Sequence, residues 1–472
     1  MKQAGWKPVF LSDHRIILII LISCVGGWIL SVPYEGQLVY SLADRFQLDS
    51  FWLLTGSLVM QILGLVTGGL LIRNIKASKR ALTISIPVCI LCTAAFLFPI
   101  SELWVVSLLV CSMGAGVCIA SCGFFIRISI VAGERYKALA NILVTIASIK
   151  LLINVIVIYI SAAVSIILLT AILGAAWYFS SLLPTLPKEE AAYTRHNKKQ
   201  LILALLMLCV FISIGTIDFG IMIYTVTPAY QHISWLSIWY GLLPYAVAAM
   251  IMKRIPALVE RNNMIYIALG MIGAAFILFM VLGNSLVGYL IVFTLMMAAW
   301  AIYDVFWWGM LGVMLDMNRN AAIVLGLGFS ANALGVIQGK LIARIPLPQT
   351  EVNTTMISLA VICATIVLLP ILHKSIAKLL PENRAINSQN ELKGTLEVPG
   401  LNDTELLTER EKQVAGLLLK GRTSKLIASE LFLSENTVKT HIKNIYAKMN
   451  VRSRAELFNR FDALLKINEP NI

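Results

Sequence analysis

Charged residues are scarce in this chain. Asp, Glu, Lys and Arg make up 13% of its 472 residues, whereas hydrophobic residues make up 58%. Soluble domains usually contain about 25% charged residues, so a single water-soluble globule is excluded. The sequence also has no Walker P-loop, H-E-x-x-H zinc motif, kinase signature or plausible nucleophile triad. We therefore expect a protein that is not an enzyme and that needs neither a cofactor nor a metal.

The cysteines indicate no disulfide framework, because all of them fall inside apolar segments. They are Cys24, Cys89, Cys92, Cys111, Cys118, Cys122, Cys209 and Cys363. Cys89 and Cys92 have a C-x-x-C spacing, but no second pair of ligands accompanies them. A free cysteine behaves as a small hydrophobic residue, so we expect these residues to serve packing.

Long apolar segments account for the hydrophobic excess and predict twelve transmembrane helices within residues 1–372. Each has roughly 18 to 25 residues, enough to cross about 30 Å of hydrocarbon. The expected spans are 16–34, 51–72, 82–100, 103–126, 138–160, 162–183, 201–225, 234–252, 264–283, 285–310, 321–342 and 355–372. The first span follows a basic N-terminus but has no small-residue cleavage pattern, so we expect it to be retained rather than removed as a signal peptide.

Basic residues are unevenly distributed among the predicted loops, which indicates the orientation. With the N-terminus in the cytoplasm, the inner segments hold Arg73, Lys76, Lys79, Arg80, Arg127, Arg135, Lys137, Lys188, Arg195, Lys198, Lys199, Lys253, Arg254, Arg261 and Arg319. The exceptions outside are Arg45 and Arg344, with Lys340 near a span end. The positive-inside rule thus predicts a cell (inner) membrane protein with both termini in the cytoplasm.

The predicted spans form two halves of six, residues 14–183 and 200–372, separated by the charged segment 184–200. This layout resembles the major facilitator superfamily in architecture, although the two halves show no clean sequence repeat. The family pattern G-x-x-x-D-R-x-G-R-[KR] between the second and third spans is only partly present. The stretch from Gly69 to Arg80 keeps the glycine and the basic residues but lacks the Asp.

The composition changes after the last span. Residues 373–403 form a juxtamembrane segment and a polar tether, and His373–Leu380 could form a short basic interfacial helix that Pro381 ends. Residues 404–472 are charged and periodic, as in a small soluble domain. Twelve Lys and Arg against nine Asp and Glu give residues 401–472 a net charge of only +3, so charge alone does not indicate a nucleic-acid partner.

Helix signals divide the C-terminal domain into four short helices. Thr408 with Glu411, and Ser453 with Glu456, form capping boxes, and Ser434 caps the third helix. The apolar positions expected in the core are Val414, Leu417, Leu418, Ile427, Leu431, Val438, Ile442, Ile445, Met449, Leu457, Phe458 and Phe461. The second and third helices, joined by a tight turn, have the form of a helix-turn-helix.

The third helix carries polar residues opposite its apolar stripe, as a helix that reads DNA does. Lys439, Thr440 and Lys443 project from one side and can reach base edges in a major groove. Phosphate contacts suit the flanking residues Asn436, Thr437, Asn444 and Lys448. The alternative is a four-helix module that docks another protein, its lysines merely solvated.

About 50 residues of this domain closely resemble the LuxR-type (GerE or NarL-type) helix-turn-helix family. The matching segments are Leu407–Glu411, Gly421, Ile427–Ala428, Leu431, Ser434–His441, Asn444–Tyr446, Lys448–Met449 and Ser453–Glu456. The resemblance implies that the third helix enters the major groove of promoter DNA, and that the fourth helix, with Leu457, Phe458 and Phe461, pairs two copies as a homodimer. Leu426 departs from the family, which commonly has Glu at this place.

Ionisable residues within predicted spans are costly and therefore informative about a ligand site. The candidates are Lys150, Asp218 and Asp304, with Asn154 and Asn332 adding polarity and Trp300, Tyr303, Trp307 and Trp308 close to Asp304 in sequence. Such a cluster could hold a small molecule or an ion. Alternatively, a Lys–Asp pair joins the two halves, Asp218 lies near the outer interface, and the aromatic residues belong to an interfacial belt.

These patterns favour a membrane-tethered transcription regulator. Its membrane domain, embedded in the lipid bilayer, senses an unknown small molecule or ion, and its C-terminal domain binds double-stranded promoter DNA as a homodimer. One alternative is a working secondary transporter that also carries a regulatory DNA-binding domain, and another is an inert bundle that only anchors that domain. The fold class predicted is all-α, a twelve-helix bundle followed by a four-helix domain.

Overall fold

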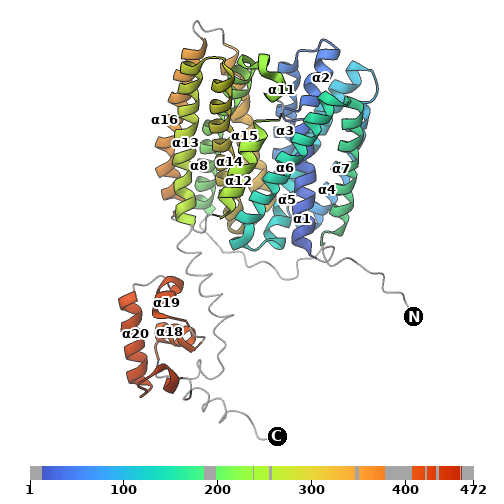
Figure 1. Ribbon diagram of the computed structural model, residues 1–472. Coiled ribbons are helices and arrows are strands. Elements are labelled where there is room, and N and C mark those ends of the chain that lie inside the picture. Colours follow the sequence, from blue (N-terminus) through green and yellow to red (C-terminus); the bar gives the residue numbers. More distant parts are fainter. Residues whose placement is uncertain are drawn as a thin grey trace, which may run out of the picture. The chain divides into compact units, whose positions relative to one another are not determined.

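The computed structural model describes residues 13–184, 198–237, 239–254, 258–345, 350–377, 407–419, 422–431, 435–457 and 459. Contacts divide the chain into two compact units, Met1–Ile376 and Ala377–Ile472, drawn blue to orange and red in Figure 1. Within the described ranges both units are helical and contain no strand. The all-α fold class is thus confirmed.

The first half of the membrane domain contains the six spans that hydropathy predicts. They are α1 (His14–Ser31), α3 (Ser50–Leu71), α4 (Ile75–Ala95), α5 (Ser101–Ser129), α6 (Ala132–Tyr159) and α7 (Ala162–Leu182). A short helix that hydropathy misses, α2 (Gln37–Arg45), joins α1 to α3. It was missed because its nine residues are amphipathic and too short to span the bilayer.

The second half contains five long spans and one that is broken. The long spans are a segment over Lys199–Ala229, α13 (Leu258–Leu282), α14 (Leu286–Met317), α15 (Ala321–Ala343) and α16 (Thr350–Ala377). The segment over Lys199–Ala229 comprises α8 (Lys198–Gly215), α9 (Ile217–Ile221), a π-helical turn (Met222–Val226) and α10 (Thr227–Ala229). Among the described residues, eleven helices are long and apolar enough to cross a membrane.

The predicted eighth span, 234–252, is wrong as a continuous helix. The chain forms a 3-10 turn (Gln231–Ile233), α11 (Ser234–Ser237) and then α12 (Leu242–Arg254). Pro244 explains the break, because its ring would clash with the carbonyl of Tyr240 in a continuous helix. Proline is tolerated in the first turn of a helix, where its missing N–H is not needed, and so α12 begins just before it. At 13 residues, α12 reaches only about 20 Å.

The two halves pack together through α3 and α5 against α15, and through α6 against α12 and α14. Small residues allow the close approach. A Cβ placed on Gly123 of α5 would lie 2.4 Å from the carbonyl oxygen of Ala321, and one on Gly326 of α15 would lie 2.5 Å from that of Leu65. Such contacts between small residues are the usual means of packing helices in lipid, where no hydrophobic effect drives them together.

The C-terminal unit is a small helical domain with its own core. Its helices are α18 (Glu409–Leu419), α19 (Ser424–Leu431) and α20 (Glu435–Lys448), and residues 454–457 begin a fourth. The core contains Leu407, Val414, Ala415, Leu417, Leu418, Ile427, Ala428, Leu431, Val438, Ile445, Met449, Val451 and Leu457. The predicted apolar stripes are therefore confirmed, with Ile442 partly buried; Ser434, Phe461 and Gly421 lie outside the described residues.

Candidate functional site

Helix α20 presents a polar face to solvent and an apolar face to the core of its domain. Val438 and Ile445 are buried, and both α18 and α19 pack against this helix. The residues predicted to contact DNA are all exposed: Asn436, Thr437, Lys439, Thr440, Lys443, Asn444 and Lys448. One helix face thus carries hydroxyl, amide and ammonium groups, the groups that bind phosphates and base edges.

Helix α18 begins with the predicted capping box. The Thr408 backbone N–H donates to Glu411 Oε2 at 2.9 Å, and the Glu411 N–H donates to the Thr408 hydroxyl at 3.4 Å. The Lys448 ammonium also donates to Glu411 Oε2, at 2.6 Å. The sequence alone does not reveal this contact. Burial alone would raise the pKa of Glu411, but the bonds from Lys448 and Thr408 hold it below its usual range.

Two of the predicted DNA-contacting lysines already have carboxylate partners. Lys439 pairs with Glu435 one turn earlier at 2.8 Å, with both side chains about half exposed. Such a surface pair is weak and can exchange for a phosphate. The partner of Lys448, Glu411, is buried, so Lys448 joins the end of α20 to the start of α18. Its predicted phosphate contact stays a prediction.

The predicted dimer contacts fall in the fourth helix. Leu457 is fully buried in the core of its own domain. Its role in pairing two copies stays a prediction. Phe458 and Phe461 lie outside the described residues. The dimer itself remains a prediction.

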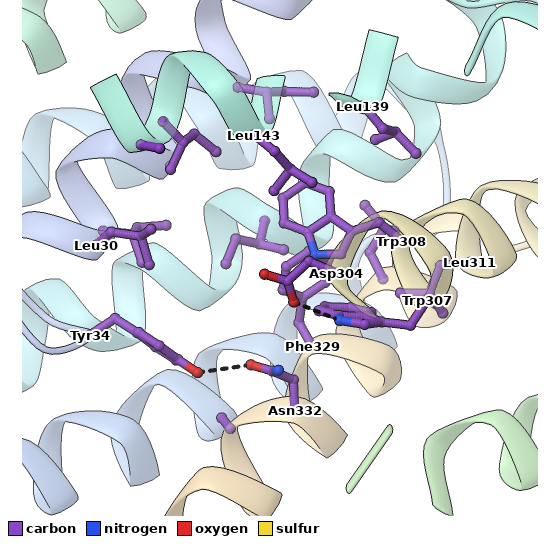
Figure 2. A pocket seen from close by; sticks show the side chains of 18 of the residues that line it. Leu30, Tyr34, Leu139, Leu143, Asp304, Trp307, Trp308, Leu311, Phe329 and Asn332 are labelled. Atoms are coloured by element: carbon purple, nitrogen blue, oxygen red, sulfur yellow. Dashed lines mark hydrogen bonds between the residues drawn. The ribbon is translucent and has the colours of Figure 1, made fainter. Parts of the chain in front are cut away.

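The membrane domain contains a cavity of about 190 Å³ between its two halves. Its lining includes Tyr34 and Lys150 from the first half and Tyr245, Asp304 and Asn332 from the second. The Tyr34 hydroxyl donates to Asn332 Oδ1 at 3.0 Å and so connects α15 to the segment after α1 (Figure 2). Most of the other lining side chains are aliphatic or aromatic.

Asp304 is the acidic group on the second-half side of this cavity. Its two oxygens accept hydrogen bonds from the Tyr245 hydroxyl at 2.7 Å and the Trp307 indole N–H at 2.9 Å, the latter drawn in Figure 2. Trp300 and Trp308 also line the cavity, as the sequence suggested. Tyr303 does not, because it stacks on Phe211 and is buried away from the lining.

Lys150 of α6 lines the same cavity but forms no hydrogen bond or ion pair with any described residue; Glu35 is the acidic group that acts on it electrostatically. The Lys–Asp pair considered as an alternative is therefore not formed. Two other candidates lie off the lining. Asn154 is buried in α6, and Asp218 is buried in α9, where it faces Ser358 of α16.

Ion pairs that the sequence did not reveal join the two halves at opposite ends of the bundle. At one end, Arg135 forms two contacts with Asp316, at 2.6 and 2.8 Å, and Arg135 is buried rather than in a loop as predicted. At the other end, the fully buried Lys340 pairs with Glu35 at 3.0 Å. Glu35 has a φ of +102°, a strained backbone of the kind found at functional sites.

Comparison with known proteins identifies the C-terminal domain. Residues 405–461 match the family model of bacterial regulatory proteins of the luxR family. The chain is 42% identical over 81 residues to the HTH-type transcriptional regulator MalT of Cronobacter sakazakii, a match that covers 17% of this chain and 9% of that one. It is 41% identical over 70 residues to MalT of Vibrio cholerae, covering 15% and 8%. The chain thus carries a LuxR-type helix-turn-helix domain but spans less than a tenth of these regulators.

Solved structures identify the fold of the membrane domain. The human organic anion transporter MFSD10 is similar with a TM-score of 0.58 at 14% identity, over 78% of this chain and all of that chain. The proton:xylose symporter XylE has a TM-score of 0.59 at 12% identity, over 78% and 96%. The chain is therefore a multi-pass membrane protein with a major facilitator fold joined to a LuxR-type domain, and the resemblance predicted from sequence is confirmed.

Proposed function

We propose that this protein is a membrane-tethered transcription regulator. Its LuxR-type domain binds promoter DNA from the cytoplasmic side of the inner membrane, and its membrane domain senses a small molecule or ion. The observation that carries the proposal is the exposed polar face of α20, with Lys439, Thr440 and Lys443, on a domain that has its own core. We assign no catalytic step to the protein.

The geometry of α20 explains how such a domain reads DNA. Residues one turn apart share a face, so Lys439 and Lys443 point the same way, with Thr440 beside them. A helix about 10–12 Å wide fits a major groove, where a lysine donates to guanine O6 or N7 and a threonine methyl contacts the methyl group of thymine. Asn436, Thr437 and Asn444 then hold the phosphates and fix the register.

We further propose that two copies bind adjacent half-sites as a homodimer through the fourth helix. Because Leu457 is buried in its own domain, exposed residues of this helix have to make the contact. A ligand in the membrane cavity can control the pairing only if it binds one arrangement of the two halves better than another. We propose that the two ion pairs between the halves, Arg135–Asp316 and Glu35–Lys340, are the contacts that change between such arrangements.

Binding of residues 400–472 to labelled promoter fragments tests the DNA-binding part of the proposal. The domain has its own core, so the fragment is expected to fold. Affinity should fall steeply as salt rises, because phosphate contacts release counterions. Promoter fragments for this assay come from a genome-wide crosslinking experiment with the full chain. Binding that does not depend on salt, or no binding to any of these fragments, would contradict the proposal.

A second candidate is a working transporter that also regulates genes. Two of the similar structures are described as an organic anion transporter and a proton:xylose symporter, and the cavity lies between the two halves as an alternating-access site requires. Uptake into proteoliposomes separates the two functions. A receptor binds its ligand without accumulating it, whereas a transporter concentrates it inside the vesicle. An inert anchor predicts that Lys150→Ala and Asp304→Ala leave reporter transcription unchanged.

A further inference from the structure

Three charged residues line the membrane cavity: Glu35, Lys150 and Asp304. Glu35 pairs with Lys340, but Lys150 and Asp304 have opposite charges and do not pair with each other. Lys150 comes from α6 of the first half, and Asp304 comes from α14 of the second. No ion pair joins them, although both line the same cavity. An unpaired charge in a low-dielectric interior is costly, and such charges in membrane proteins usually serve a ligand or an ion path.

The two charges have different surroundings. The carboxylate of Glu35, which also lines the cavity, is already engaged by Lys340 at 3.0 Å, so Lys150 has no carboxylate of its own among the described residues. Asp304 accepts one hydrogen bond on each oxygen, both from neutral donors, and keeps acceptor capacity because a carboxylate has about four acceptor sites. The cavity therefore offers an anion-binding place and a separate cation-binding place.

Aromatic rings complete the place for a cation. Trp308 packs edge-on against Phe329 at 4.9 Å, Trp307 lies 5.0 Å from the same ring, and all three residues line the cavity with Asp304 (Figure 2). Ring faces attract an ammonium group and add to the attraction of a carboxylate. Two further lining residues, Trp300 and Gln61, have buried polar atoms without a hydrogen-bond partner among the described residues. These atoms are the indole N–H of Trp300 and the side-chain amide oxygen of Gln61.

We propose that the cavity binds a small zwitterion: an apolar or aromatic body with an ammonium group against Asp304 and an anionic group against Lys150. A neutral zwitterion pairs both charges, whereas a ligand with one charge leaves the other unpaired in the interior. The cavity volume of about 190 Å³ is more than ten times the roughly 10–15 Å³ that one water needs, so the cavity has room for a small organic molecule. Binding of the zwitterion does not depend on the proposed sensing role. Only an effect of that binding on promoter DNA rests on it.

Binding of four matched aromatic probes to the purified full-length protein tests the ligand class. The probes are 4-(aminomethyl)benzoate, a zwitterion; 4-methylbenzylamine, a cation; 4-methylbenzoate, an anion; and 4-methylbenzyl alcohol, which is neutral. Calorimetry at pH 7 should show the zwitterion binding roughly tenfold or more tightly than each of the others. A probe with one charge or none that binds as tightly, or no measurable binding of the zwitterion, overturns the proposal.

Variants then assign each charge. Lys150→Met should weaken binding of the zwitterion about tenfold without weakening that of 4-methylbenzylamine, because the variant removes the charge that this cation leaves unpaired. For the same reason, Asp304→Asn should weaken binding of the zwitterion without weakening that of 4-methylbenzoate. Lys137→Met is the matched control, because Lys137 is an exposed lysine of the same helix outside the cavity lining. Asp304→Glu keeps the charge and should keep the preference for the zwitterion, so it separates loss of the charge from loss of folding. If Asp304→Asn loses the preference only because it unfolds, its thermal midpoint falls as well.

Promoter occupancy measured on the same samples separates this proposal from the sensing role. If the zwitterion binds with the expected preference but DNA binding stays unchanged, the ligand class stands and sensing fails. If DNA binding responds to a probe with a single charge, sensing stands and the zwitterion proposal fails.

Discussion

Arg135 of α6 and Asp316 of α14 form a two-point ion pair that joins the two halves of the membrane domain. Both nitrogens at the tip of the guanidinium donate to the carboxylate, and the Arg135 side chain also donates to the carbonyls of Ile130, Arg127 and Gly312. A buried arginine with this many partners fixes the local geometry more strongly than a surface pair would. This contact therefore closes one end of the interface between the halves.

Removing the arginine should destabilise the membrane domain. We expect Arg135→Ala to cost roughly 2–5 kcal/mol, since it leaves Asp316 and buried carbonyls without their donor. Thermal unfolding of the detergent-solubilised full chain measures the loss. Arg80→Ala is the control, because Arg80 is exposed. An equal thermal midpoint for both variants would contradict the structural role given to Arg135.

The ion pairs at the two ends should have opposite effects on the output if the proposed sensor changes between two arrangements. Asp316→Asn weakens the contact at one end, and Lys340→Met weakens the contact with Glu35 at the other. Each change favours the arrangement that opens its own end, so reporter transcription should rise with one variant and fall with the other. A shift in the same direction for both would instead indicate a general loss of folding.

Lys443 is the sharpest test of the DNA-binding face, because it is exposed and has no carboxylate partner in the described ranges. Lys443→Ala should cost roughly 1–3 kcal/mol of discrimination between the preferred and altered promoter sequences. Competition binding with single-base variants measures it. Lys412→Ala, on α18, should leave the discrimination unchanged. Equal weakening on every sequence would make Lys443 a phosphate contact instead.

Sequence predicted the C-terminal domain well because its signals are local. The capping box of Thr408 and Glu411 and the apolar stripe of α20 depend on residues three or four apart, and the structure forms both. Inter-half contacts could not be predicted in this way. Arg135 and Asp316 are 181 residues apart, and Glu35 and Lys340 are 305 apart, so only the folded bundle brings them together.

The membrane site was predicted in part, for a related reason. The free-energy cost of placing an ionisable side chain inside a membrane span pointed to Lys150 and Asp304, and both line the cavity. The same criterion also selected Asp218 and Asn154, because hydropathy cannot tell which face of a span points inward. Uniformly apolar helices carry almost no periodic signal, and the direction of each side chain is then set by helix packing.

The contact between Glu411 and Lys448 makes the stability of the C-terminal domain depend on pH. The pKa of Glu411 lies below its ordinary value in the folded domain, mainly because Lys448 and Thr408 donate to the carboxylate. The resulting stabilisation is complete above the unfolded pKa of about 4.3 and is lost as the pH falls through the lower folded value. Urea unfolding of residues 400–472 should therefore show a midpoint that falls below about pH 4.5.

Glu411→Gln should remove this dependence and lower the stability at pH 7 by roughly 1–3 kcal/mol, because an amide accepts these hydrogen bonds less strongly. Lys448→Met should also lose stability, and more than Lys443→Met, since Lys443 has no such partner among the residues that the structure describes. If Lys448→Met instead unfolds like the wild type and only weakens DNA binding, Lys448 is a phosphate contact whose bond to Glu411 contributes nothing to the fold.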